Sequence, residues 1–177
     1  MFPKKVMTVL LLPALVLLSA TPQSVSSHAA VGSPSASAAS DMQGLSSVEK
    51  KKYAASHFLG FYTVFGRIAS DVCGAEGVDL TAYVSAFTLK HKAELVQAKR
   101  IIAASGISDE QMASIARGRR SVMEANVRRS MLDLAAALHK TTVADGCAYV
   151  ASNATDAASA QSYAEASPDV EAILMSN

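Results

Sequence analysis

Two cysteines, Cys73 and Cys147, carry the most readily assigned chemistry in this sequence. Thiol-exchange pairs usually have the spacing Cys-x-x-Cys, and covalent haem attachment needs Cys-x-x-Cys-His; neither spacing occurs here. Each cysteine instead lies beside a glycine, in Cys73-Gly74 and Gly146-Cys147. Two such cysteines pair in an oxidising compartment, so the sequence predicts one structural disulfide between them.

Four histidines, His28, His57, His91 and His139, are the remaining candidates for metal or acid–base chemistry. The sequence has no Glu-x-x-His motif and no two histidines at helical spacing, which helical metal sites commonly use. It also lacks a Gly-x-Ser-x-Gly nucleophile elbow, a phosphate-binding loop and a dinucleotide fingerprint. We therefore expect no metal, no cofactor and no enzymatic activity.

The N-terminus has the pattern of a secretory signal peptide. A basic start at Met1–Lys5 precedes an apolar run from Val6 to Leu18, and Ser27-His28-Ala29 offers the small residues of a cleavage site. The apolar run is shorter than the roughly 20 residues of a membrane-spanning helix, so we expect no transmembrane segment. The sequence predicts a signal peptide over residues 1–29 and a mature chain that is periplasmic or secreted.

Composition separates a leader from one folded domain. Residues 30–44 are mostly serine, alanine, glycine and proline, which bury little apolar surface, so we expect a flexible leader. Residues 45–177 have the size of a single domain. The chain is 50% hydrophobic but only 6% aromatic, it has no tryptophan, and alanine is abundant; this composition favours helices over sheets. The expected fold class is all-α.

Capping residues and apolar spacing predict three long helices and a smaller C-terminal helical section. The first runs from the capping box at Ser46 to Gly74, and the second from Asp79 to Gly106. The third begins at the capping box of Ser108 and extends to about residue 144, where Asp145-Gly146 ends it. Its expected buried face comprises Met112, Ile115, Ala116, Val122, Met123, Val127, Met131, Leu134 and Leu138. The remaining section is expected to break near Asn153 and to restart at Pro168.

Short connections imply an antiparallel bundle whose helices run up, down and up. In that arrangement the ends of the first and third helices share a pole, so Cys73 and Cys147 meet there. Their disulfide would staple the bundle and stabilise it by about 4 kcal/mol.

An aromatic stripe on the first two helices has two interpretations. At helical spacing it is expected to form the core of the bundle, but a C-terminal section that fails to cover it would leave an apolar groove. The residues of this stripe are Phe58, Phe61, Tyr62, Phe65, Tyr83 and Phe87.

Charge argues against nucleic-acid binding but leaves room for a protein partner. The chain has 16 Lys and Arg against 15 Asp and Glu, a net charge of +1, whereas nucleic-acid binders carry a basic excess. The antiparallel bundle collects cations at the pole opposite the disulfide and acids such as Asp71 at the disulfide pole. The cations proposed to bind a partner are Lys99, Arg100, Arg117, Arg119 and Arg120.

Three hypotheses for the function follow. The first is an exported, non-enzymatic protein–protein interaction module of the cell envelope, of an accessory, chaperone-like or inhibitor type. Its partner would be another envelope or secreted protein, an acidic one being one candidate. The second is a helical carrier of a small apolar ligand. The third is an enzyme or metal protein whose site the sequence does not reveal. The oligomeric state does not follow from the sequence.

Overall fold

The computed structural model describes residues 41–176, which form helices and turns without a β-strand. The predicted all-α class is confirmed. The predicted signal peptide, residues 1–29, and most of the predicted leader, residues 30–44, lie outside the described residues. The described end of that leader already belongs to the domain, because Met42 is buried in the core.

The first long helix consists of α2 (Ser47–Tyr62), the π-helical segment η2 (Thr63–Ile68) and α3 (Ala69–Ala75), which follow one another directly. The predicted capping box begins it. The Ser46 hydroxyl accepts from Glu49 N, and the Glu49 carboxylate accepts from Ser46 N at 2.9 Å. Two backbone donors at this helix start are thereby satisfied within four residues of sequence.

This helix ends later than predicted. Gly74 lies inside the last turn of α3, and Gly77 adopts the left-handed conformation with φ of +79°. Val78 N donates to Cys73 O, and Gly77 N donates to Gly74 O. These two bonds form a Schellman motif, in which Gly77 is the residue that must tolerate a positive φ.

The second predicted helix is two helices in the structure. They are α4 (Thr81–Lys90) and α5 (Lys92–Ala104), separated at His91, whose ψ of 21° departs from helical geometry. Asp79 precedes α4, and its carboxylate accepts from Thr81 N at 2.8 Å. Gly106, with φ of +73°, follows α5 and ends it as predicted.

The third helix, α6 (Asp109–Ala137), begins at the predicted capping box, in which the Ser108 hydroxyl accepts from Gln111 N. Its predicted end near residue 144 is wrong, because the chain leaves the helix at Leu138. A separate helix, α7 (Val143–Ser152), begins at a capping box of Thr142 and Asp145. Asp145 therefore starts a helix and does not end one.

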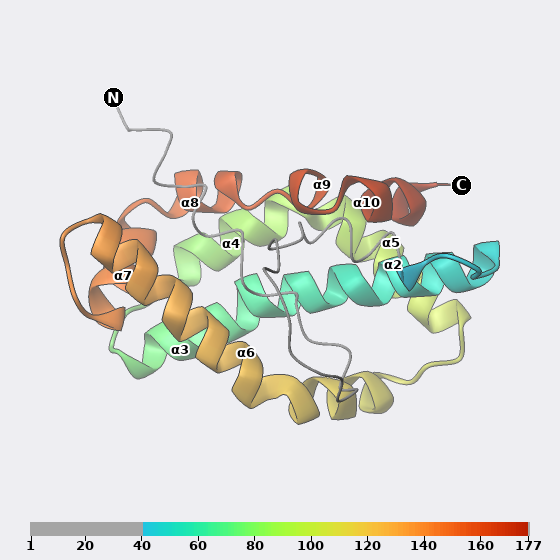
Figure 1. The fold of residues 1–177 in the computed structure, drawn as a ribbon, viewed down its shortest axis with the longest axis horizontal. Coiled ribbons are helices and arrows are strands. Elements are labelled where there is room, and N and C mark those ends of the chain that lie inside the picture. Colours follow the sequence, from blue (N-terminus) through green and yellow to red (C-terminus); the bar gives the residue numbers. More distant parts are fainter. Residues whose placement is uncertain (1–40, 177) are drawn as a thin grey trace, which may run out of the picture.

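The C-terminal section consists of α8 (Ala154–Ala160), α9 (Tyr163–Ala166) and α10 (Pro168–Met175). The predicted break at Asn153 is confirmed, since this residue separates α7 from α8. Pro168 occupies the first turn of α10, as predicted. The three short helices lie in a row along the bundle, with α8 on α4 and α10 on α2 and α5 (Figure 1).

The long helices run in the predicted order of directions. In Figure 1 the chain passes along α2 and α3, returns along α4 and α5, and runs back along α6. The packing of α6 is uneven, however, because it contacts η2, α3 and α7, while its first half extends past them. No helix among residues 41–176 combines the length and the apolar character that crossing a membrane requires.

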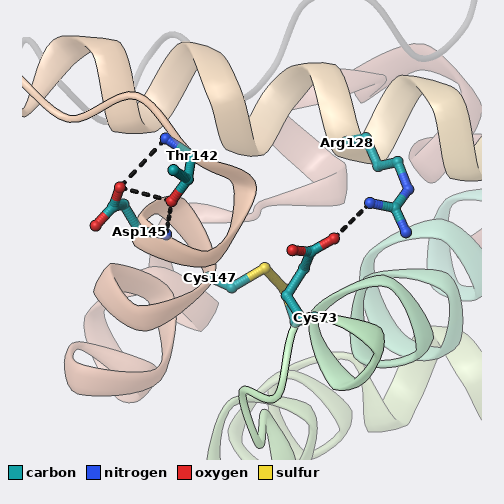
Figure 2. The surroundings of a disulfide bond; sticks show 6 residues. Cys73, Arg128, Thr142, Asp145 and Cys147 are labelled. Carbon is teal, nitrogen blue, oxygen red and sulfur yellow. Dashed lines mark hydrogen bonds and ion pairs between the residues drawn. A yellow bond between two sulfur atoms is a disulfide. The ribbon is translucent and has the colours of Figure 1, made fainter.

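The Sγ atoms of Cys73 and Cys147 lie 2.02 Å apart, at disulfide-bond distance, so the predicted pairing is confirmed. Both residues are fully buried. The bridge joins α3 to α7 beside the Thr142–Asp145 cap (Figure 2). Cys147 reaches this position on a helix of its own, which packs back against α6, and not at the end of the third helix.

Candidate functional site

The predicted aromatic stripe is the core of the bundle and not an open groove. Phe58, Phe61, Tyr83 and Phe87 are buried, and Tyr62 and Phe65 are half-buried against them. Tyr163 from α9 covers the stripe: its ring centroid lies 5.0 Å from that of Phe58 and 5.2 Å from that of Phe61. The C-terminal section therefore completes the core.

His91 is buried among these aromatic rings and is 1% exposed. Its Nε2 lies 2.8 Å from the carbonyl oxygen of Gln161, and its Nδ1 lies 3.3 Å from the Glu94 carboxylate. A carbonyl oxygen can only accept, so Nε2 carries the hydrogen of that bond. The side chain thus ties the α4–α5 break to the segment between α8 and α9, which is a structural role.

His57 occupies a second polar site in the core wall. Its Nδ1 is 2.9 Å from the Tyr163 hydroxyl, and its Nε2 is buried without a hydrogen-bond partner. Burial lowers the pKa of His57, an effect that Asp41 partly opposes. Burial also raises the pKa of Tyr163, so its hydroxyl stays neutral and available for the hydrogen bond.

A cavity of about 30 Å³ lies between α6 and the segments η2, α4, α7 and α8. Its lining includes Phe65, Tyr83, Asn126 and Ser130, and also Gln161, whose Oε1 is buried without a partner. A volume of this size has room for about one water molecule, which needs polar partners such as these. The cavity is far smaller than the pockets that hold drug-sized ligands.

One of the five predicted partner-binding cations, Arg120, does not lie at the expected pole. Lys99 and Arg100 are exposed near the end of α5, and Arg117 and Arg119 are exposed in the first half of α6. Arg120 differs from the others, because it donates to Asp71 on α3 at 2.9 Å and to Glu124 at 2.7 Å. The prediction that placed Arg120 at the opposite pole from Asp71 is wrong, since α6 crosses α3 at this point.

The ion pairs of Arg120 with Asp71 and Glu124 partly neutralise its positive charge. The hydrogen bonds that the Arg120 guanidinium donates, first to Glu124 and then to Asp71, raise its pKa. Arg128, two turns further along α6, donates to Glu76 at 2.6 Å. Both arginines therefore hold α6 against the end of the first helix, where their charges are partly neutralised.

The first half of α6 is the most exposed helical segment that the structure describes. From Glu110 to Val122 every described residue is exposed except Ala116 and Arg120, which are half-buried. Ile115 is 56% exposed and Val122 is 44% exposed, although the apolar spacing predicted both on the buried face. That prediction is wrong for these two residues and correct for Val127, Met131 and Leu134, which are buried.

Further along α6 two residues that the sequence interpretation did not single out lie on the same exposed side. Arg129 is exposed without an ion-pair partner among the described residues, and Leu132 is 41% exposed. The sequence does contain a signal for them: Val122, Ala125, Arg129 and Leu132 follow one another at steps of three and four, which places them on one side of a helix. We call Ile115, Gly118, Val122, Ala125, Arg129 and Leu132 the outer face of α6.

Metal ligands do not gather in the part of the chain that the structure describes: no three His, Cys, Asp or Glu side chains come close enough to share an ion. Comparison with known proteins does not suggest a function by analogy. No family model, curated protein or solved structure matches this chain. The outer face of α6 is therefore the candidate functional site, on the strength of its own exposure and charge.

Proposed function

We propose that this chain is an exported, non-enzymatic interaction protein of the cell envelope, of an accessory, chaperone-like or inhibitor type. The observation that carries the proposal is the exposed first half of α6, where Ile115 and Val122 face solvent beside Arg117 and Arg119. Exposed apolar side chains within a polar rim are typical of protein interfaces. The signal-peptide pattern of residues 1–29 and the Cys73–Cys147 bridge support the periplasmic or secreted location.

The low intrinsic stability of the first half of α6 also supports a docking role. The segment from Glu110 to Val122 gains little from tertiary packing, and an isolated helix of this length is marginal in water. Gly118, in its middle, costs about 1 kcal/mol relative to alanine. A partner that covers this segment would supply the packing that the chain itself does not provide.

The carrier hypothesis receives less support than the interaction hypothesis. The aromatic stripe is covered by Tyr163, and the neighbouring cavity has a volume of only about 30 Å³. A small apolar ligand such as benzene needs a cavity of roughly 150 Å³. No specific observation favours the carrier function.

The test is site-specific photo-crosslinking in the cells that export the protein. A photoreactive residue replaces Val122, and a matched control replaces Leu89, which is 74% exposed on α4. We expect a discrete crosslinked product from position 122 that is absent from position 89 and that weakens with Arg117→Glu/Arg119→Glu. Failure to crosslink from both Ile115 and Val122 would contradict the proposed function.

A further inference from the structure

The outer face of α6 has the residue spacing of a helix-pairing surface. Its six residues alternate steps of three and four, the spacing of positions a and d in a coiled coil. Gly118 and Ala125 stand seven residues apart between the larger side chains, which allows another helix to approach closely. All six are exposed, so no helix among residues 41–176 covers this face.

Three arginines on or beside this face are unpaired in the described part of the chain, and the unpaired carboxylates of Glu110 and Asp133 lie near its two ends. Arg117 and Arg119 flank its first half, and Arg129 lies within it. These arginines form no ion pair with a described residue, in contrast to Arg120 and Arg128. An arginine at a heptad core position favours a partner with a carboxylate opposite it, because an uncompensated charge would be costly to bury there.

We propose that the outer face of α6 binds an acidic amphipathic helix of a partner protein. This inference rests on the proposed interaction function and specifies the chemistry of the partner. Branched apolar residues of the partner pack around Gly118, between Ile115 and Val122, and around Ala125, between Val122 and Arg129. Glutamates or aspartates at its flanks pair with Arg117, Arg119 and Arg129, and fix the register of the two helices.

Two other occupants fit the observations less well. A second copy of α6 would bring three unpaired arginines towards one another, whereas the described exposed carboxylates on α6 without an ion pair are Glu110 and Asp133. An anionic membrane surface favours interfacial helices with Trp, Phe or Leu on the apolar face. The outer face of α6 contains no Trp or Phe, and Leu132 at its end is its one Leu.

The experiment uses the mature full-length protein and designed peptides of 21 residues. The acidic peptide has Leu and Ile at its a and d positions and Glu at e and g; the control peptide replaces each Glu by Lys. We expect binding of the acidic peptide alone, measured by fluorescence anisotropy. Arg117→Glu/Arg119→Glu should weaken that binding roughly tenfold, since each reversed charge removes one attraction and adds one repulsion.

Matched variants separate this face from general charge effects. Lys92→Glu/Lys140→Glu makes the same charge change at exposed positions outside α6 and should leave the affinity within about threefold, through long-range electrostatics alone. Val122→Asp should abolish peptide binding, and hydrogen exchange of residues 110–122 should slow only when the acidic peptide is bound. Circular dichroism verifies that each variant retains the helical fold.

Each contrary outcome points to a distinct conclusion. Equal binding of both peptides, or no binding of the acidic one, overturns the inference even if crosslinking from Val122 upholds the interaction function. Arginine-dependent binding to vesicles of anionic phospholipid, without peptide binding, assigns the face to a membrane. A dimer by native mass spectrometry that Val122→Asp dissociates assigns it to a second copy. If the acidic peptide binds but no crosslink forms in the exporting cell, the proposed interaction function is contradicted. The inference that the outer face of α6 can bind an acidic helix would still stand.

Discussion

The Nε2 atom of His91 lies 2.8 Å from the carbonyl oxygen of Gln161, 70 residues away along the chain. This contact connects the break between α4 and α5 to the turn that leads into α9. Both groups are buried, since His91 is 1% and Gln161 is 3% exposed. The same residue thus interrupts a helix and fastens the C-terminal section over the aromatic core.

Replacing His91 by leucine should destabilise the protein by about 3 kcal/mol, because it leaves the buried Gln161 carbonyl without a donor and removes the contact with Glu94. Denaturant unfolding measures the loss. His139→Asn is the matched control: His139 is exposed and has φ of +59°, which asparagine tolerates. Equal effects of the two substitutions would show that the buried contact contributes nothing.

Gly146→Ala should destabilise the protein by about 3 kcal/mol or more. A Cβ at Gly146 would lie 2.1 Å from the carbonyl oxygen of Met131, so α7 could not keep its present distance from α6. Gly74→Ala is the control, because a Cβ there meets nothing within 4 Å and should stabilise the helix by about 0.5 kcal/mol. Thermal unfolding of the two variants should therefore shift in opposite directions.

Removing the disulfide with Cys73→Ala/Cys147→Ala should lower the free energy of unfolding by about 4 kcal/mol, since the bridge closes a long loop in the unfolded chain. The two residues are separated by 74 positions in the sequence. Chemical denaturation of wild type with and without reductant should give a comparable difference. Alkylation of both cysteines in native, unreduced protein would contradict the bridge.

The stability of the protein should decrease as the pH falls below about 6.5, the ordinary pKa of histidine. Burial lowers the pKa of His57 in the folded protein, so the unfolded chain takes up a proton there first. The contribution is complete above the unfolded pKa and is lost as the pH falls towards the lowered one. Unfolding free energies at pH 7.5 and 5 should differ less in His57→Gln than in wild type or His139→Asn.

Features set by neighbouring residues were predictable from the sequence. The capping boxes of Ser46 and Ser108, the stop at Gly106 and the restart at Pro168 each depend on bonds or angles within a few positions. The cap at Thr142 has the same kind of signal, Thr-x-x-Asp, which the continuous apolar spacing of the third helix obscured. Local signals also misled, because the helix stops predicted at Gly74 and at Asp145-Gly146 lie inside α3 and α7.

Features set by distant residues were not predictable. The break at His91 depends on Gln161, which no spacing rule connects to it. The exposure of Ile115 and Val122 depends on which segment of α6 other helices cover. Periodicity places residues on a shared face, but it does not state whether a neighbour packs there. The candidate site therefore became visible only from the tertiary arrangement.

The bridge between Cys73 and Cys147 encloses residues 74–146, which include the whole of the exposed half of α6. A trypsin-like protease that cuts after Arg117 or Arg119 would therefore produce two fragments that remain covalently joined. The nicked molecule would keep its full mass, increased by one water, until a reductant separates the pieces. In a compartment rich in proteases, cleavage of its most accessible helix would change the molecule without dividing it.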